Sequence, residues 1–144
     1  MPLHLIKLCV GATSIADLED WIAGRAAAAR KAGVAFEQVH VTRMVPARRD
    51  ELLSGGSLYW VIKGEVAARQ TLLDLRTFVD GEGIRRCALV LDPQVVPVVP
   101  RPARPFQGWR YLAPGEAPKD LAREEAAGDL PEEMRRELRD LGLL

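Results

Sequence analysis

The chain has 144 residues, 48% hydrophobic and 28% charged, which is ordinary for a globular domain with its own core. Its 20 basic and 20 acidic residues cancel, which argues against a protein that coats nucleic acid through net charge alone. The N-terminal apolar stretch is too short for a signal peptide and is interrupted by Lys7, and no apolar run reaches membrane-spanning length. We therefore expect a cytoplasmic protein without a membrane partner.

The charge is distributed unevenly along the chain. Residues 40–110 carry 11 Lys or Arg against 7 Asp or Glu, whereas residues 111–144 carry 5 against 9. A basic surface and an acidic terminal segment are therefore expected on one neutral protein. We hypothesise that the acidic segment covers the basic surface when no partner is bound.

The cysteines and histidines give no sign of a metal site. Cys9 and Cys87 both lie in apolar runs, which predicts two buried thiols rather than a disulfide or a reactive thiol. His4 and His40 are the only histidines, and the four residues lack the spacing of a zinc site. We predict no metal and no cofactor.

The first part of the chain predicts a strand and then a helix. Residues 3–10 read as the strand, and the helix begins at Ser14, which forms a capping-box pattern with Asp17. Gly33 ends the helix. Trp21 lies at the helix's apolar spacing, so we expect it in the core.

A second and a third strand follow, separated by a short helix. Residues 36–45 alternate, and the valines at 39, 41 and 45 are expected to share one face with Arg43. After Pro46, PARRDELLSGG predicts one or two helical turns closed by glycines. Residues 57–63 then form the clearest strand, with Leu58, Trp60 and Ile62 on one face and Tyr59, Val61 and Lys63 on the other.

The middle of the chain predicts further strands. Residues 69–78 alternate as a strand, whereas EVAARQ before them is weakly helical. A turn at 80–83 precedes a continuous apolar run at 87–91, typical of a central strand. Five prolines within residues 93–105 predict an extended edge or a rigid arm, and residues 106–112 return to strand-like content.

The C-terminal part is acidic and helical in pattern. Residues 117–127 are mildly helical, and residues 129–144 predict a capped helix with one apolar stripe. That stripe either docks on the domain or contacts a second chain as a homodimer. We expect a single α+β domain over residues 1–115 and a helical extension over residues 116–144 packed on it. The domain is expected to hold a small curved mixed or antiparallel sheet, with a closed barrel as one form, flanked by N-terminal and C-terminal helices.

Arginine and aromatic residues concentrate in the middle of the chain. Lys is almost absent there, and bidentate or stacking contacts require Arg. The glycine-flanked strand GGSLYWVIKG and the segment RPFQGWRYL add flat faces beside these charges. Each feature has an alternative interpretation without a ligand. The arginines would form a solvated surface, the glycine-flanked strand would be a hairpin strand with its Trp in the core, and RPFQGWRYL would be an aromatic cluster that fixes the proline arm. The candidate ligand-binding residues are Arg43, Arg48, Arg49, Tyr59, Lys63, Arg69, Trp109 and Arg110.

Several blocks of the sequence together resemble a known family. HLIKLCVG, HVTRMVPARRDELLSGGSLYWVIKG, IRRCALVLDP and RPFQGWRYL are similar to domain of unknown function 1489, found chiefly in alphaproteobacteria. That resemblance implies a bacterial cytoplasmic protein and carries no assigned activity. ELLSGGSLYWVIKG also resembles the turn and strand that enter the barrel of PUA-like domains, which include RNA-binding modules.

We hypothesise that the protein binds RNA or a nucleotide-like anion, with Arg43, Arg48, Arg49 and Lys63 on phosphate and Tyr59 and Trp109 stacking on a base. The sequence contains no GxSxG, P-loop or GxGxxG motif. An enzyme acting on a small phosphorylated or nucleotide-derived substrate is the alternative, and it would need Lys63 and a carboxylate such as Glu65 or Asp74 in one pocket. A protein-interaction module using the proline arm and the C-terminal helix is a third.

Overall fold

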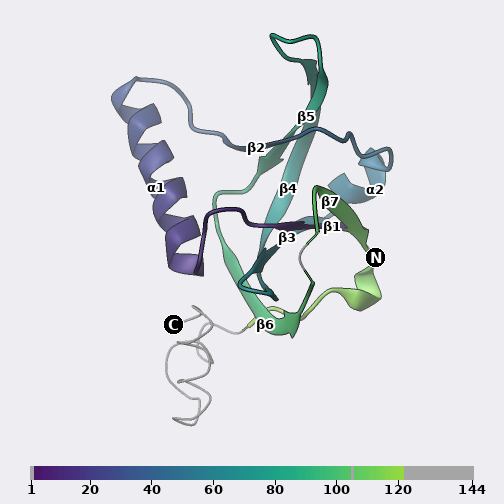
Figure 1. Cartoon of the computed structure of the whole chain (residues 1–144). Coiled ribbons are helices and arrows are strands. Elements are labelled where there is room, and N and C mark those ends of the chain that lie inside the picture. Colours follow the sequence, from purple (N-terminus) through teal and green to yellow (C-terminus); the bar gives the residue numbers. More distant parts are fainter. Residues whose placement is uncertain (1, 105, 122–144) are drawn as a thin grey trace.

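A seven-stranded mixed sheet and two α-helices make up the part of the chain that the computed structural model describes, residues 2–104 and 106–121 (Figure 1). The strands are β1 (His4–Leu8), β2 (Gln38–Thr42), β3 (Ser57–Ile62), β4 (Glu65–Val79), β5 (Arg85–Leu91), β6 (Val96–Pro102) and β7 (Trp109–Leu112). The helices are α1 (Ile15–Lys31), α2 (Arg49–Leu53) and the short 3-10 helix η1 (Pro114–Glu116). The predicted α+β class is confirmed. The helix predicted over residues 129–144 lies outside the described residues.

The sheet is open. Its strand order is β2-β5-β4-β3-β1-β7, and β6 pairs with β4 off this path. β1 runs parallel to β3, and every other strand pair is antiparallel. Since β2 and β7 stand at the two ends of the order, this is a curved open sheet rather than a closed barrel. None of the described helices is long and apolar enough to cross a membrane.

β4 is long enough to serve two parts of the sheet. Its first half pairs with β3 and β6, and its second half pairs with β5, with a register shift between Leu72 and Asp74. Leu73 is the extra residue at that shift and is exposed, while Leu72 and Leu75 are buried. The weak helical pattern of EVAARQ was therefore misleading, because pairing on both edges holds these residues in a strand.

β3 lies between two groups of buried side chains. Leu58, Trp60 and Ile62 contribute to a large core cluster that also contains residues of α1, β4 and β5. Tyr59 and Val61 contribute to a smaller cluster on the opposite face, with residues of β1, β4, β6 and β7. The predicted alternation of β3 is confirmed, and both of its faces are buried.

α1 begins and ends close to where the sequence predicts, but Trp21 is not in the core. Ser14 Oγ accepts a hydrogen bond from the Asp17 amide at 3.1 Å, whereas the Asp17 carboxylate accepts from the amide and hydroxyl of Thr13. The Trp21 side chain is 41% exposed and lies over Gly11, where an added Cβ would be 3.1 Å from the ring. The prediction for Trp21 is wrong because Ile15, Leu18 and Ile22 form the buried stripe.

The inward face of β2 carries Gln38, His40 and Thr42 rather than Val41. Gln38 and Thr42 are buried, and the His40 ring meets the Trp60 ring edge-to-face at 5.1 Å. Val41 consequently points outward and is 46% exposed. The exposed valine face also accommodates Arg43, which could not be buried on it without a partner.

The proline-rich strand follows the sequence prediction, whereas Lys63, which the sequence analysis placed at the end of a strand, lies in a turn. A two-residue turn joins β3 to β4, and both Lys63 and Gly64 have positive φ, as a type I′ hairpin requires. β6 contains the prolines and pairs with β4 alone, so it lies at an edge, where a missing amide donor is tolerated.

Gly56 is the position where the fold leaves no room for a side chain. A Cβ there would fall well inside van der Waals contact with the backbone oxygens of Leu3 and Leu52. Gly56 also donates its amide to Leu52 and accepts from the Leu72 amide, both at 2.9 Å. This residue therefore ties the end of α2 to β1 and β4.

We expect Gly56→Ala to lower the free energy of unfolding by about 3 kcal/mol, because backbone atoms must move to admit the methyl group. Gly24→Ala is the matched control, since an added Cβ in the middle of α1 meets nothing within 4 Å. That substitution should raise stability by roughly 0.5 to 1 kcal/mol through helix propensity. Urea denaturation of both variants tests the pair, and equal effects would contradict it.

Candidate functional site

The structure places the eight predicted ligand-binding residues in three separate regions. Arg43, Arg48, Arg49 and Trp109 lie where the chain leaving β2 passes β7. Tyr59 and Arg69 face each other across β3 and β4 on the opposite side of the sheet. The remaining two, Lys63 and Arg110, lie on the β3–β4 turn and on β7.

The segment between β2 and α2 is fixed by two aromatic side chains of β7. Trp109 Nε1 donates a hydrogen bond to the Met44 carbonyl at 2.7 Å. The Tyr111 hydroxyl accepts from the amides of Ala47 and Arg48, at 2.9 and 3.2 Å. The two rings meet edge-to-face at 4.9 Å. These bonds connect the two ends of the open sheet without strand pairing, and they fix residues 43–49, of which the three arginines are exposed and Pro46 is buried. We call this segment, with Tyr111, the arginine edge.

The arginines of this edge are exposed and only loosely neutralised. Arg48 pairs with Glu51, and its guanidinium lies 5.6 Å from the centre of the Tyr111 ring. Arg49 donates to an Asp74 carboxylate oxygen at 2.6 Å and to the Leu75 carbonyl at 3.3 Å. A shallow recess of about 280 Å³ is lined by residues 47–51. Exposed ion pairs of this kind contribute about 0–1 kcal/mol, so another anion can compete for these arginines.

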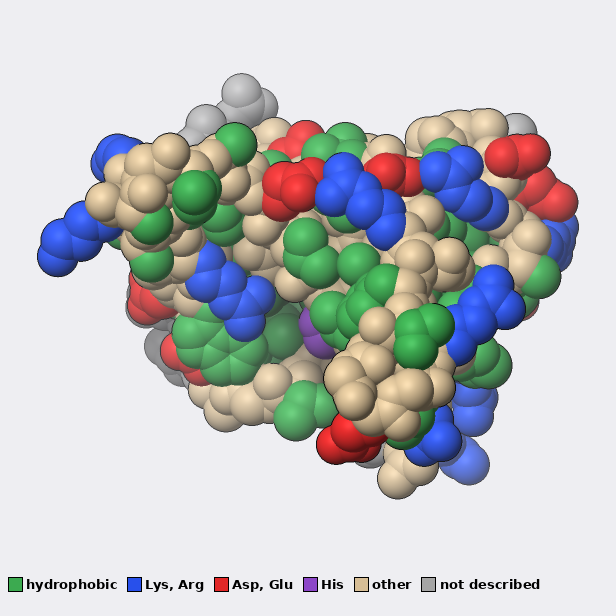
Figure 2. Space-filling model, turned by 90° about the horizontal axis from the view of Figure 1, so that it is seen from above, with side chains coloured by type: hydrophobic (Ala, Val, Ile, Leu, Met, Phe, Trp, Pro, Cys, Tyr) green, Lys and Arg blue, Asp and Glu red, His purple; other side chains and the backbone are tan. Residues whose placement is uncertain are grey.

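The face of the molecule seen in Figure 2 does not show one continuous basic patch among the described residues. In the view of Figure 2, Lys and Arg side chains alternate with Asp and Glu side chains and with hydrophobic ones. The neutral charge total is therefore reproduced on this face, and any polyanion has to be recognised by individual arginines rather than by a uniform field.

Tyr59 and Trp109 are buried, with 4% and 5% of their surface exposed. Neither ring has a free face on which a base could stack, because Tyr59 belongs to the smaller core cluster and Trp109 to the larger one. Tyr111 is the half-buried aromatic beside the arginines, and the sequence hypothesis did not select it. Its position two residues after Trp109 in the same strand was the available signal, since such residues share a face.

The second region is a polar cluster around Arg69. Its Nε and Nη2 donate to the two carboxylate oxygens of Asp120, both at 2.7 Å. Nη1 donates to the Ser57 hydroxyl at 3.0 Å and lies 3.4 Å from the Thr71 hydroxyl. The Arg69 side chain is 22% exposed, which is the lowest value among the ion-paired arginines of the described residues.

Two further groups complete this cluster. His4 Nδ1 accepts from the Ser57 amide at 3.0 Å, and its ring meets the Tyr59 ring edge-to-face at 5.0 Å. Burial and the charge of Arg69 lower the pKa of His4, which keeps the imidazole neutral as that acceptor role requires. Burial raises the pKa of Tyr59.

Lys63 and Arg110, the residues of the third region, do not form a site together. Lys63 is exposed on the β3–β4 turn, and Arg110 stacks its guanidinium on the Phe106 ring at 4.6 Å. Asp74 is held on the second half of β4 by Arg49 and Arg76. Asp74 therefore lies in the half of β4 that is remote from Lys63, and these two residues do not form the pair that an acid–base enzyme would need. Glu65 begins β4 directly after the turn, and its Oε2 is buried without a hydrogen-bond partner among the described residues.

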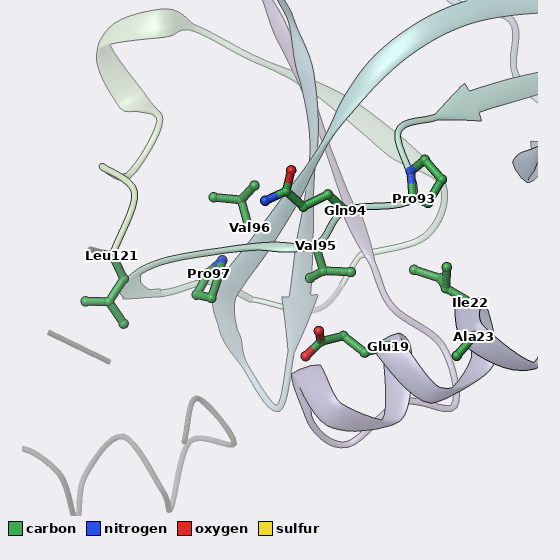
Figure 3. A pocket seen from close by; sticks show the side chains of 9 residues that line it. All are labelled: Glu19, Ile22, Ala23, Pro93, Gln94, Val95, Val96, Pro97 and Leu121. Carbon is green, nitrogen blue, oxygen red and sulfur yellow. The ribbon is translucent and has the colours of Figure 1, made fainter. Parts of the chain in front are cut away.

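A pocket of about 480 Å³ lies between α1 and the chain that enters β6 (Figure 3). Glu19 and Ile22 of α1 line one side, and residues 93–97 line the other, with Leu121 at the rim. Glu19 is the only charged residue among the nine that line it. This pocket suits an apolar group rather than a phosphate.

A second hollow lies between α1 and β2 and is lined by the half-buried imidazole of His40. It has a volume of about 620 Å³, and Arg25, Phe36 and His40 are among its lining residues. His40 Nε2 is buried and has no hydrogen-bond partner in the described part of the chain. Burial, with smaller effects from Lys7 and Arg25, lowers the pKa of His40 to about 4.

The thiols and possible metal ligands add no chemistry to these regions. Cys9 and Cys87 are free and buried, which confirms the prediction for both, and burial raises the pKa of Cys9 to about 11. Within residues 2–104 and 106–121, no three His, Cys, Asp or Glu side chains are grouped as a metal site would require.

Comparison with protein families identifies the chain. Residues 5–144 match the family described as "Protein of unknown function (DUF1489)", and the chain belongs to that family. Comparison with curated proteins and with solved structures gives no match. The family resemblance seen in the sequence is thus confirmed, whereas the similarity to PUA-like domains stays a prediction.

The buried neutral His40 predicts a pH-dependent stability. Because its folded pKa of about 4 lies below the unfolded value of about 6.5, the unfolded state binds more protons between these values. The free energy of unfolding should be fully retained above pH 6.5 and fall by about 2 to 3 kcal/mol toward pH 4.

Urea denaturation at several pH values measures this loss, and a His40→Gln variant should show a flatter profile over the same window. NMR titration of the imidazole gives an independent value. A titration of His40 near its ordinary pKa would contradict the burial argument.

Proposed function

We propose that this protein binds single-stranded RNA, or a nucleotide that carries the same phosphate and base groups, at the arginine edge. The observation that supports this proposal best is the attachment of residues 43–49 to β7 by Trp109 and Tyr111. Three arginines on one fixed segment can contact successive phosphates. A flexible segment would first have to be ordered, and the conformational entropy lost on binding would weaken the affinity.

Arg48 and Tyr111 form the most specific part of the proposed site. A guanidinium beside an aromatic ring presents a planar cation and a planar π surface together, which suits a phosphate next to a base. Binding would exchange Glu51 for a phosphate on Arg48 and would draw Arg49 away from Asp74. Arg43 lies in the same segment and is exposed.

The paired substitution Arg48→Ala/Arg49→Ala tests the proposal. We expect it to weaken binding of a fluorescein-labelled single-stranded RNA about tenfold or more in anisotropy titrations, since two charge-assisted contacts are lost. The slope of log Kd against log salt should also fall by about 0.7 for each lost phosphate contact.

Arg30→Ala/Lys31→Ala is the matched control, because it removes the same charge from the last turn of α1, on the other side of the molecule from α2 (Figure 1). Equal weakening by both pairs would show that only general charge matters and would contradict the proposed site. Competition by a mononucleotide at low concentration would assign the edge to a nucleotide instead of RNA. An absence of salt-dependent binding would exclude both.

A further inference from the structure

The Arg69 cluster has the geometry of an anion-binding site that is already filled from within the chain. The guanidinium presents Nε and Nη2 to a carboxylate in the side-on bidentate arrangement, at 2.7 Å for each bond. The carboxylate belongs to Asp120, which lies 51 positions further along the chain. No local sequence pattern joins these two residues.

Arg69 is held in place independently of Asp120. Its third nitrogen donates to the Ser57 hydroxyl, and Thr71 lies beside it, both from strands that pair in register. Tyr59 lies directly across from Arg69 in the neighbouring strand. The two donors aimed at Asp120 would therefore keep their direction if that carboxylate left, which is what a preorganised site requires.

Asp120 is less firmly held than Arg69. Its side chain is 47% exposed, compared with 22% for Arg69. It lies on a short segment, residues 119–121, which contacts β6 through one isolated bridge to Val98 and through backbone bonds of Val99 and Leu121. A segment with so few bonds can separate from an edge strand at a modest cost.

We propose that Arg69, Ser57 and Thr71 form a binding site for the carboxylate of a second molecule, and that Asp120 occupies this site as an intramolecular ligand. The incoming carboxylate takes over both bonds from Nε and Nη2, and the 119–121 segment moves off the edge of β6. This site lies on a different face of the sheet from the arginine edge, and the two proposals stand on separate observations.

Removing the Asp120 carboxylate should create a partly buried cation without a partner. Such a charge is destabilising, and a small anion that fits the vacated space should restore stability. We expect Asp120→Ala to lower the melting temperature, and sodium acetate to raise it again in a saturable way beyond sodium chloride of equal ionic strength.

The matched control is Glu37→Ala, which breaks the bidentate pair with Arg76, a half-exposed guanidinium that keeps its bond to Asp74 when Glu37 is removed. Acetate should not exceed chloride in that variant, nor in Arg69→Gln/Asp120→Ala. Equal effects of acetate and chloride in Asp120→Ala would overturn the proposal. If Asp120→Ala does not fold, Asp120→Ser serves for the same comparison, because its shorter side chain also vacates the space beside Nε and Nη2 of Arg69.

Acetate binding to the full-length wild-type chain supplies the second arm, monitored through the NMR signal of the Arg69 Nε–H. Since Asp120 competes with acetate in the wild type, the apparent affinity of the wild-type chain for acetate should be about tenfold or more weaker than that of the Asp120→Ala variant. Equal affinities would show that Asp120 does not occupy the site. A response to inorganic phosphate but not to acetate would overturn the assignment to carboxylates.

Discussion

The change of partner halfway along β4 determines where the charged side chains of this protein lie. The first half of the strand, between β3 and β6, places Arg69 beside Tyr59 and Ser57. The second half, beside β5, leaves its other edge facing α2, where the Leu75 carbonyl and the Asp74 carboxylate receive Arg49. The bulge at Leu73 separates the two halves. A strand without it would turn either Leu72 or Leu75 outward, so one of the two charged regions would change face.

The arginines consequently fall into two physical classes. Arg48 and Arg49 have half-exposed side chains, and their carboxylate partners can be exchanged at little cost. Arg69 is more buried, is ordered by hydroxyl groups and holds one carboxylate with two bonds. The first class suits an extended ligand whose contacts form and break one at a time, and the second suits one small anion. A neutral protein can in this way carry two anion sites of different character.

Local chemistry made much of this fold predictable from the sequence. Ser14 caps a helix and the prolines of β6 lie at an edge, because each follows from the backbone preferences of the residues concerned. The inward face of β2 was not predictable, since His40 turns inward to meet Trp60 from a distant strand. The pairing of Arg69 with Asp120 also depends on long-range packing. The sequence led only to the hypothesis that the acidic C-terminal segment covers a basic surface, and it did not indicate which residues would pair. Arg43, Arg48 and Arg49 stayed together because they lie in one segment, and long-range packing brings Trp109 to that segment and Tyr59 beside Arg69.

Nucleic acid that accompanies the protein from the cell tests the central claim, a functional arginine edge, most directly. Full-length protein would be purified at low salt without nuclease, and the bound RNA would be quantified before and after a high-salt wash. Our account predicts RNA that the wash removes and that Arg48→Ala/Arg49→Ala protein lacks from the outset. Wild-type protein that emerges free of RNA at low salt, or RNA retained equally by the variant, would contradict it.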